Sequence, residues 1–205
     1  RNGMIITPGS TPQARATPHL AALGERNTKL PDVYLAMARA AYNAGDIAGA
    51  AVNFEKAVAL REDGRTWFNL GVVRARLGNT AGALEALERA MDGVRATKAV
   101  HICYGYGTPT VLAWKTRNTD WGHYGVTLPL LARSSVDQVS VETAASGVDV
   151  AVLGELGEKQ VLAGVIDVGT EEVESPETVA GRIRRILPFV DASRLLPSTD
   201  CGLVL

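Results

Sequence analysis

The chain has 205 residues, a formal net charge of -1 and 46% hydrophobic residues, which is the balance of an ordinary soluble globular protein. This charge excludes the basic footprint of a nucleic-acid or anionic-membrane binder, and no apolar run reaches the length of a membrane span. The two cysteines, Cys103 and Cys201, are too few for a disulfide scaffold. They favour a reducing, cytoplasmic compartment in which thiols serve as ligands or nucleophiles.

Composition and periodicity divide the chain into three parts. Residues 1–30 hold three prolines among Ser and Thr and carry no period, so we predict a loose N-terminal arm. Residues 31–92 have a helical period, and residues 93–205 alternate between strand and helix patterns. We therefore expect an all-α segment followed by an α/β segment. The abrupt ends at Arg1 and Leu205 are compatible with a fragment of a longer protein.

An internal repeat of 33 residues runs through residues 31–92. We expect helices over residues 33–44, 47–60, 65–77 and 80–92, with turns at Gly45 and Gly78. The pattern resembles the tetratricopeptide repeat, whose two copies here are fewer than the three or so that are stable alone. A peptide partner would bind a face carrying Asn43, Asn69 and Arg76, whereas plain helix packing needs no partner. The pairs that recur are Tyr34 and Trp67, Met37 and Leu70, Ala38 and Gly71, Gly45 and Gly78, Ala50 and Ala83, Phe54 and Leu87, and Ala57 and Ala90.

The remainder of the chain predicts four βα units. Strand-like runs occupy residues 99–103, 136–142, 161–168 and 194–196, and helical patterns fall near 121–133, 147–156 and 176–189. Runs such as Val-Leu-Ala-Gly-Val-Ile are apolar on both faces, which is typical of a parallel sheet buried under helices. Ser175, Pro176 and Glu177 form a favourable start for the last helix.

Metal-binding side chains collect at the ends of these strands. His101 and Cys103 are two residues apart, so they point to the same face of a strand. Glu142, Asp167 and Cys201 follow the other three strands, and the carboxyl ends of parallel strands share one edge of a sheet. Alone, each residue has a simpler interpretation as a packed or hydrogen-bonded group. Together, an imidazole, two thiolates and a carboxylate make a tetrahedral zinc set.

Four motifs carry a family resemblance: His-Ile-Cys-Tyr-Gly-Tyr-Gly (101–107), Asp-Gln-Val-Ser-Val-Glu-Thr (137–143), Gly-Val-Ile-Asp-Val-Gly-Thr (164–170) and Thr-Asp-Cys-Gly (199–202). In this order they resemble the C-terminal catalytic barrel of cobalamin-independent methionine synthase, in its shorter, core-type branch. The likeness runs from about residue 83 to residue 205. The helix expected over residues 83–90 therefore belongs both to this resemblance and to the second helical repeat.

The resemblance implies a methyltransferase of methionine biosynthesis that binds zinc through His101, Cys103, Glu142 and Cys201. The zinc would hold the sulfur of homocysteine as a thiolate, which attacks a methyl group from a methylated folate or another donor. Asp167 would be a polar catalytic residue beside the metal. Zinc is the one cofactor that these motifs imply.

Two departures leave activity open. Four βα units supply only the second half of a (β/α)8 TIM barrel, and Gly169 stands where the longer enzymes have a histidine. The open edges of a half barrel would be covered by the repeat helices or by a second copy in a homo-oligomer. The alternatives to an enzyme are a tetratricopeptide interaction module fused to a non-catalytic zinc-binding barrel remnant, and a chimeric chain.

The stretch 104–124 gathers most of the aromatic residues: Tyr104, Tyr106, Trp114, Trp121 and Tyr124. We expect either a wall over the zinc or the packing of a long βα loop onto its neighbouring helix. His123 lies in the same region and is expected to be a surface group.

Overall fold

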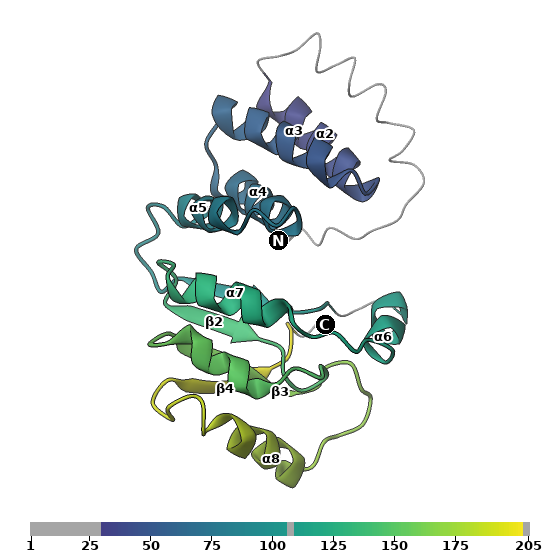
Figure 1. Cartoon of the computed structure of the whole chain (residues 1–205), viewed down its shortest axis with the longest axis vertical. Coiled ribbons are helices and arrows are strands. Elements are labelled where there is room, and N and C mark those ends of the chain that lie inside the picture. Colours follow the sequence, from purple (N-terminus) through teal and green to yellow (C-terminus); the bar gives the residue numbers. More distant parts are fainter. Residues whose placement is uncertain (1–29, 106–108, 203–205) are drawn as a thin grey trace. The chain divides into compact units, whose positions relative to one another are not determined.

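The computed structural model describes residues 30–105 and 109–202, so the predicted arm lies almost wholly outside the described residues. The chain divides into two compact units, Arg1–Gly93 and Val94–Leu205 (Figure 1). In the described ranges, every helix is too short or too polar to cross a bilayer. Each unit is considered by itself below.

The first unit is built from helices that pack in chain order. Each predicted helix is present, with boundaries shifted by at most two residues. At the middle of the layer Phe54 is fully buried, and Gly71 lets α4 and α5 approach closely. A Cβ on Gly71 would lie 3.3 Å from the carbonyl oxygen of Ala83, so a larger side chain would force the helices apart. The helices are α2 (Pro31–Asn43), α3 (Ile47–Leu60), α4 (Gly64–Arg76) and α5 (Thr80–Ala90).

The turn inside each helix pair has the same geometry. Gly45 and Gly78 have φ angles of 83° and 74°, in the left-handed region that favours glycine. Asp46 and Asn79 follow them as N-caps, and each accepts a hydrogen bond from the backbone N–H three residues later, at 2.7 and 2.9 Å. The two turns, 33 residues apart, thus have the same backbone conformation and the same type of N-cap. Assignment of these helices to the tetratricopeptide repeat remains a prediction.

The second unit contains a parallel sheet of four strands in the order β1-β2-β3-β4. The prediction of parallel strands joined by helices is therefore confirmed. Because right-handed crossovers between sequential strands keep their helices on one face, this order is the one found in (β/α) barrels. The strands are β1 (Ala99–Ile102), β2 (Gln138–Val141), β3 (Gln160–Ile166) and β4 (Leu195–Thr199).

The connections between the strands differ from the prediction at two places. The helical pattern near 147–156 is a 3-10 helix, and a short helix that was not predicted forms inside the long connection after β1. The last helix begins as expected, because the side chain of Ser175 accepts a hydrogen bond from Thr178 N at 3.2 Å. The elements are α6 (Pro109–Lys115), α7 (His123–Ala132), η1 (Val150–Leu156) and α8 (Pro176–Ile186).

Only one face of the sheet is fully buried. Alternate residues such as Val139, Val161 and Val165 are at most 1% exposed and so share one covered face of the sheet. On the other face Ile166 remains 42% exposed and Leu196 37% exposed. Burial on both faces was therefore a wrong expectation for this part of the chain. In the described residues, β1 and β4 each pair with a single strand.

Candidate metal centre

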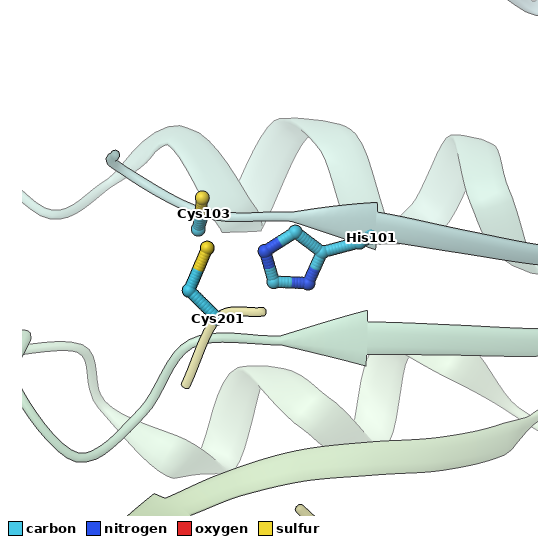
Figure 2. Close-up of side chains that lie close together, drawn as sticks. All are labelled: His101, Cys103 and Cys201. Carbon is cyan, nitrogen blue, oxygen red and sulfur yellow. The ribbon is translucent and has the colours of Figure 1, made fainter. Parts of the chain in front are cut away.

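Three of the four predicted zinc ligands lie together. One ligand atom each from His101, Cys103 and Cys201 can be chosen so that all three atoms lie within 4.8 Å of one another. Figure 2 shows the side chains of Cys103 and Cys201 close together, with the imidazole ring of His101 beside them. His101 belongs to β1, Cys103 comes directly after β1, and Cys201 follows β4.

This convergence depends on the curvature of the sheet. β1 and β4 are its outer strands, which would lie about 14 Å apart in a flat sheet with three strand spacings. The two sulfur atoms nevertheless approach within 4.8 Å. Residues placed just beyond the strand ends must therefore turn in towards a common point, as they do at the carboxyl end of a (β/α) barrel.

A buried aspartate holds the Cys201 segment in place. Asp200 is 0% exposed, and its carboxylate accepts hydrogen bonds from the backbone N–H groups of Thr143, Ala144 and Ala145 at 2.7 to 3.1 Å. These three groups come directly after Glu142. Asp200 therefore ties the segment that carries Cys201 to the segment that carries the predicted carboxylate ligand.

Glu142 is not one of the three clustered side chains, and its carboxylate is bonded to Lys115 and to the backbone of Tyr104, the residue after Cys103. It follows β2, is 0% exposed, and forms an ion pair with Lys115 Nζ at 2.8 Å through Oε1. Its Oε2 accepts a hydrogen bond from Tyr104 N at 3.1 Å. Each carboxylate oxygen has a second lone pair, so these contacts leave acceptor capacity for a metal ion. The role of Glu142 as a ligand remains a prediction.

Asp167 is outside the cluster of three ligands. Its Oδ1 accepts a hydrogen bond from Gly169 N at 2.7 Å, within the turn that follows β3. The Asp167 N–H donates to Glu174 Oε2 at 3.0 Å, and Glu174 is paired with Arg182. The Asp167 carboxylate thus stabilises its own loop, and its catalytic role remains a prediction.

Burial shifts the pKa values of Cys103, His101 and Glu142. It raises the pKa of the Cys103 thiol to about 11, so this thiol keeps its proton at neutral pH until a cation stabilises the thiolate. Burial also lowers the pKa of His101, which leaves the imidazole neutral and able to donate a lone pair. The pKa of Glu142 is raised by burial, and the hydrogen bond from Lys115 opposes that rise.

The donor set fits a zinc ion. Tetrahedral zinc with Zn–S bonds of about 2.3 Å separates two sulfur ligands by less than about 4 Å, and the observed 4.8 Å limit allows that spacing. The hydrogen bond of 2.9 Å between His101 Nδ1 and Ser140 Oγ fixes the ring and leaves Nε2 for a metal. The two soft sulfurs and one imidazole favour zinc over magnesium or calcium.

The aromatic residues near the cluster pack against one another. The Tyr104 ring lies with its centroid 4.8 Å from Trp121, 5.0 Å from Tyr124 and 6.0 Å from Trp114. The Tyr104 hydroxyl donates to the carbonyl oxygen of Trp121 at 2.8 Å. These contacts are those of a packed loop, while Tyr106 lies outside the described residues. A role as a wall over the metal remains a prediction.

Sequence reasoning missed two residues of this region, Lys115 and Asp200. Lys115 lies in the unpredicted helix α6, where the apolar run Pro-Thr-Val-Leu-Ala-Trp before a single cation is only a weak signal. Asp200 stands directly before Cys201 in the motif that was recognised, so its position beside a ligand was a usable signal. Its partners, the backbone groups after Glu142, follow only from the fold.

Comparison with known proteins points to one family for this unit. Residues 121–204 match the family model "Cobalamin-independent synthase, Catalytic domain". The matched range contains Glu142, Asp167 and Cys201 and begins after His101 and Cys103. The match covers the strands β2 to β4 and the helices between them.

Individual relatives agree with the family model. The chain is 31% identical over 124 residues to a methionine synthase of Thermococcus kodakarensis, covering 60% of this chain and 32% of the relative. It is 33% identical over 147 residues to a 2-hydroxypropyl-CoM lyase of Xanthobacter autotrophicus, covering 60% of this chain and 39% of the relative. Both relatives are therefore far longer than the part they share with this chain.

A solved structure is also similar. It is a B12-independent methionine synthase from Shewanella sp. W3-18-1 in complex with selenomethionine, with a TM-score of 0.57 and 31% identity. The likeness covers 81% of this chain and 48% of that chain, so this chain spans about half of the solved protein. Together, the family model, the relatives and this structure show that the C-terminal unit is similar to the catalytic domain of cobalamin-independent methionine synthase.

Proposed function

We propose that the C-terminal unit forms part of a methyltransferase that transfers a methyl group to the thiolate of homocysteine at a zinc centre. The observation that carries this proposal is the meeting of His101, Cys103 and Cys201 from the two outer strands. Glu142, 0% exposed and near the cluster, would be the fourth ligand. The family match over residues 121–204 supports the same chemistry.

Each residue has a physical task in this scheme. His101, held through Nδ1 by Ser140, would offer Nε2 in a fixed direction. Cys103 and Cys201 would bind the zinc ion as thiolates. Asp200 would hold the segment that carries Cys201 in a fixed position against the segment that follows Glu142. A bound zinc ion would keep a coordinated substrate thiol ionised at neutral pH and so make it a strong nucleophile. Asp167 would be a polar group beside the site.

We further propose that the sheet is the second half of an eight-stranded (β/α) barrel. The sequential parallel order, the open face and the singly paired outer strands support this arrangement. The relatives exceed this chain in length, so another four βα units, in the same or another chain, would supply the remainder. The amino-acid end of homocysteine and the methyl donor, a methylated folate in the longer enzymes, would bind largely there.

A second acceptor thiol belongs in the assay because one relative is a 2-hydroxypropyl-CoM lyase. Coenzyme M, like homocysteine, presents a free thiol that a zinc centre could ionise. If zinc binds without activating either thiol, the chain is better described as a helical module joined to a non-catalytic barrel remnant.

The experiment measures zinc content, then proton release on addition of each thiol, and then methyl transfer from methylated folate. The proposal predicts one zinc per chain and proton release with homocysteine. His101→Gln and Cys201→Ser should lose both, whereas His123→Gln, at an exposed position on α7, should keep both. A wild-type chain without zinc, or a Cys201→Ser chain that retains it with unchanged affinity, would remove the metal centre.

A further inference from the structure

A buried lysine lies beside the candidate metal centre and is not part of the predicted ligand set. The Lys115 side chain is 5% exposed and its Nζ lies 2.8 Å from Glu142 Oε1. Burial of an ammonium group is costly unless it is paired and hydrogen-bonded, so this contact is a specific feature of the fold. Lys115 ends α6, the short helix within the connection between β1 and α7.

The contact fixes the orientation of a carboxylate that is hydrogen-bonded to the residue directly after Cys103. Lys115 holds Oε1 of Glu142, and Tyr104 N holds Oε2 at 3.1 Å. Tyr104 directly follows Cys103, so Glu142 is tied to the backbone of the segment that carries a sulfur ligand. With both oxygens held, the carboxylate cannot rotate freely, and any metal ion in the cluster meets it in one orientation.

Lys115 also balances the net charge of the predicted metal centre. Two thiolates, one carboxylate and a zinc dication sum to one negative charge in a buried place, and the ammonium group of Lys115 cancels it. Asp200 adds another carboxylate nearby, and its charge is stabilised by three backbone N–H groups. Lys115 is thus the cation in direct contact with the predicted ligand Glu142.

We propose that Lys115 is a positioning residue of the metal centre, which holds Glu142 in the orientation that completes the zinc ligand set. This inference rests on the proposed zinc function. It goes beyond that function by assigning to Lys115 a part of the metal affinity, although Lys115 itself binds no metal. Outer partners of metal ligands commonly contribute about 10–100-fold to metal affinity.

The test measures zinc affinity by competition with a chromophoric chelator at one fixed pH, and the cobalt(II) absorption spectrum of each variant. Lys115→Met should weaken zinc binding by about 10–100-fold and change the cobalt ligand-field bands, because the carboxylate is no longer held. Lys115→Arg should recover much of the affinity. Lys159→Met is the matched control, since Lys159 is half-buried and donates to the carbonyl oxygen of Ser134, away from the metal.

A merely structural role predicts a different outcome. In that case Lys115→Met lowers the melting temperature of the metal-free chain, while zinc affinity and the cobalt spectrum stay as in wild type, and this result would overturn the inference. A wild-type chain that binds no zinc would instead overturn the proposed function and this inference with it. The two failures are therefore distinguishable.

A double variant covers the case in which Lys115→Met does not fold. Glu142→Gln removes the buried carboxylate, so adding Lys115→Met leaves no unpaired charge behind. The inference predicts that Glu142→Gln weakens zinc binding and that the double variant binds zinc no more weakly than Glu142→Gln alone. A further loss of similar size in the double variant would show that Lys115 acts independently of Glu142, and it would contradict the proposal.

Discussion

Replacement of Asp200 by alanine should destabilise the C-terminal unit more than any exposed aspartate does. The carboxylate is 0% exposed and accepts four hydrogen-bond contacts of 2.7 to 3.1 Å from three successive backbone N–H groups. Removal leaves these donors without their acceptor and opens a cavity beside Gly164, where an added Cβ would lie only 2.6 Å from Asp200 Cα. Both effects act on the region that joins β2, β3 and β4.

The magnitude follows from the contacts. A hydrogen bond to a charged acceptor contributes about 1.5–3 kcal/mol, and the three donors act on one group, so their contributions are not additive. We expect a loss of about 3–5 kcal/mol in the free energy of unfolding for Asp200→Ala. Asp200→Asn should cost about 2 kcal/mol, because the amide keeps one acceptor oxygen but places an NH2 group against a backbone donor.

The assay is urea unfolding of the full chain followed by tryptophan fluorescence. Trp114 and Trp121 report the C-terminal unit, and a Trp67→Phe background removes the signal of the helical unit. Asp149→Ala is the control, since Asp149 is an N-cap that accepts one exposed hydrogen bond from Ala151 N at 3.0 Å. It should cost about 1 kcal/mol.

Equal effects of Asp200→Ala and Asp149→Ala would refute this reasoning. They would mean that the three backbone groups after Glu142 find water or other acceptors at little cost. In that case Asp200 would not be what holds the Cys201 segment in place, and another contact would have to join β4 to β2.

Three further predictions concern other parts of the chain. Mild oxidation of the metal-free protein with diamide should join Cys103 and Cys201 in an intramolecular disulfide, which mass spectrometry detects. Loading the protein with zinc beforehand should block this disulfide. A chain that forms only intermolecular disulfides would contradict the short distance between the two sulfur atoms. Zinc affinity should rise with pH above neutrality, because burial raises the pKa of the Cys103 thiol to about 11 and the thiol must lose its proton to bind zinc. Competition titrations that show the same zinc affinity at every pH would contradict this prediction. Gly71→Leu should lower the stability of the helical unit by about 1–3 kcal/mol in thermal unfolding, whereas Ala48→Leu, at an exposed position of α3 in the same unit, should cost less than half as much.

The parts of the fold that follow from local chemistry could be predicted from the sequence. Gly45 and Gly78 mark turns because a left-handed backbone favours glycine, and the following Asp46 and Asn79 are strong N-caps. The start of α8 at Pro176 follows from the same rules. The meeting of His101, Cys103 and Cys201 could be predicted because the carboxyl ends of parallel strands share one edge of the sheet.

The parts that depend on tertiary packing could not be predicted. The apolar spacing in residues 150–156 suits an α-helix and a 3-10 helix equally, so the choice was made by packing against α7. The seven residues of α6 are too few to show a period. Glu142 and Lys115 are 27 residues apart, and nothing local reveals that they form an ion pair. Likewise, the apolar side chain of Ile166 does not reveal that its face of the sheet is exposed.

X-ray absorption spectroscopy of the zinc-loaded chain tests the central claim most directly. We expect one zinc per chain with two sulfur neighbours at about 2.3 Å and two nitrogen or oxygen neighbours at about 2.0–2.2 Å. These would be Cys103, Cys201, His101 and Glu142. A first coordination shell with one sulfur or none would contradict a shared centre built from both outer strands of the sheet.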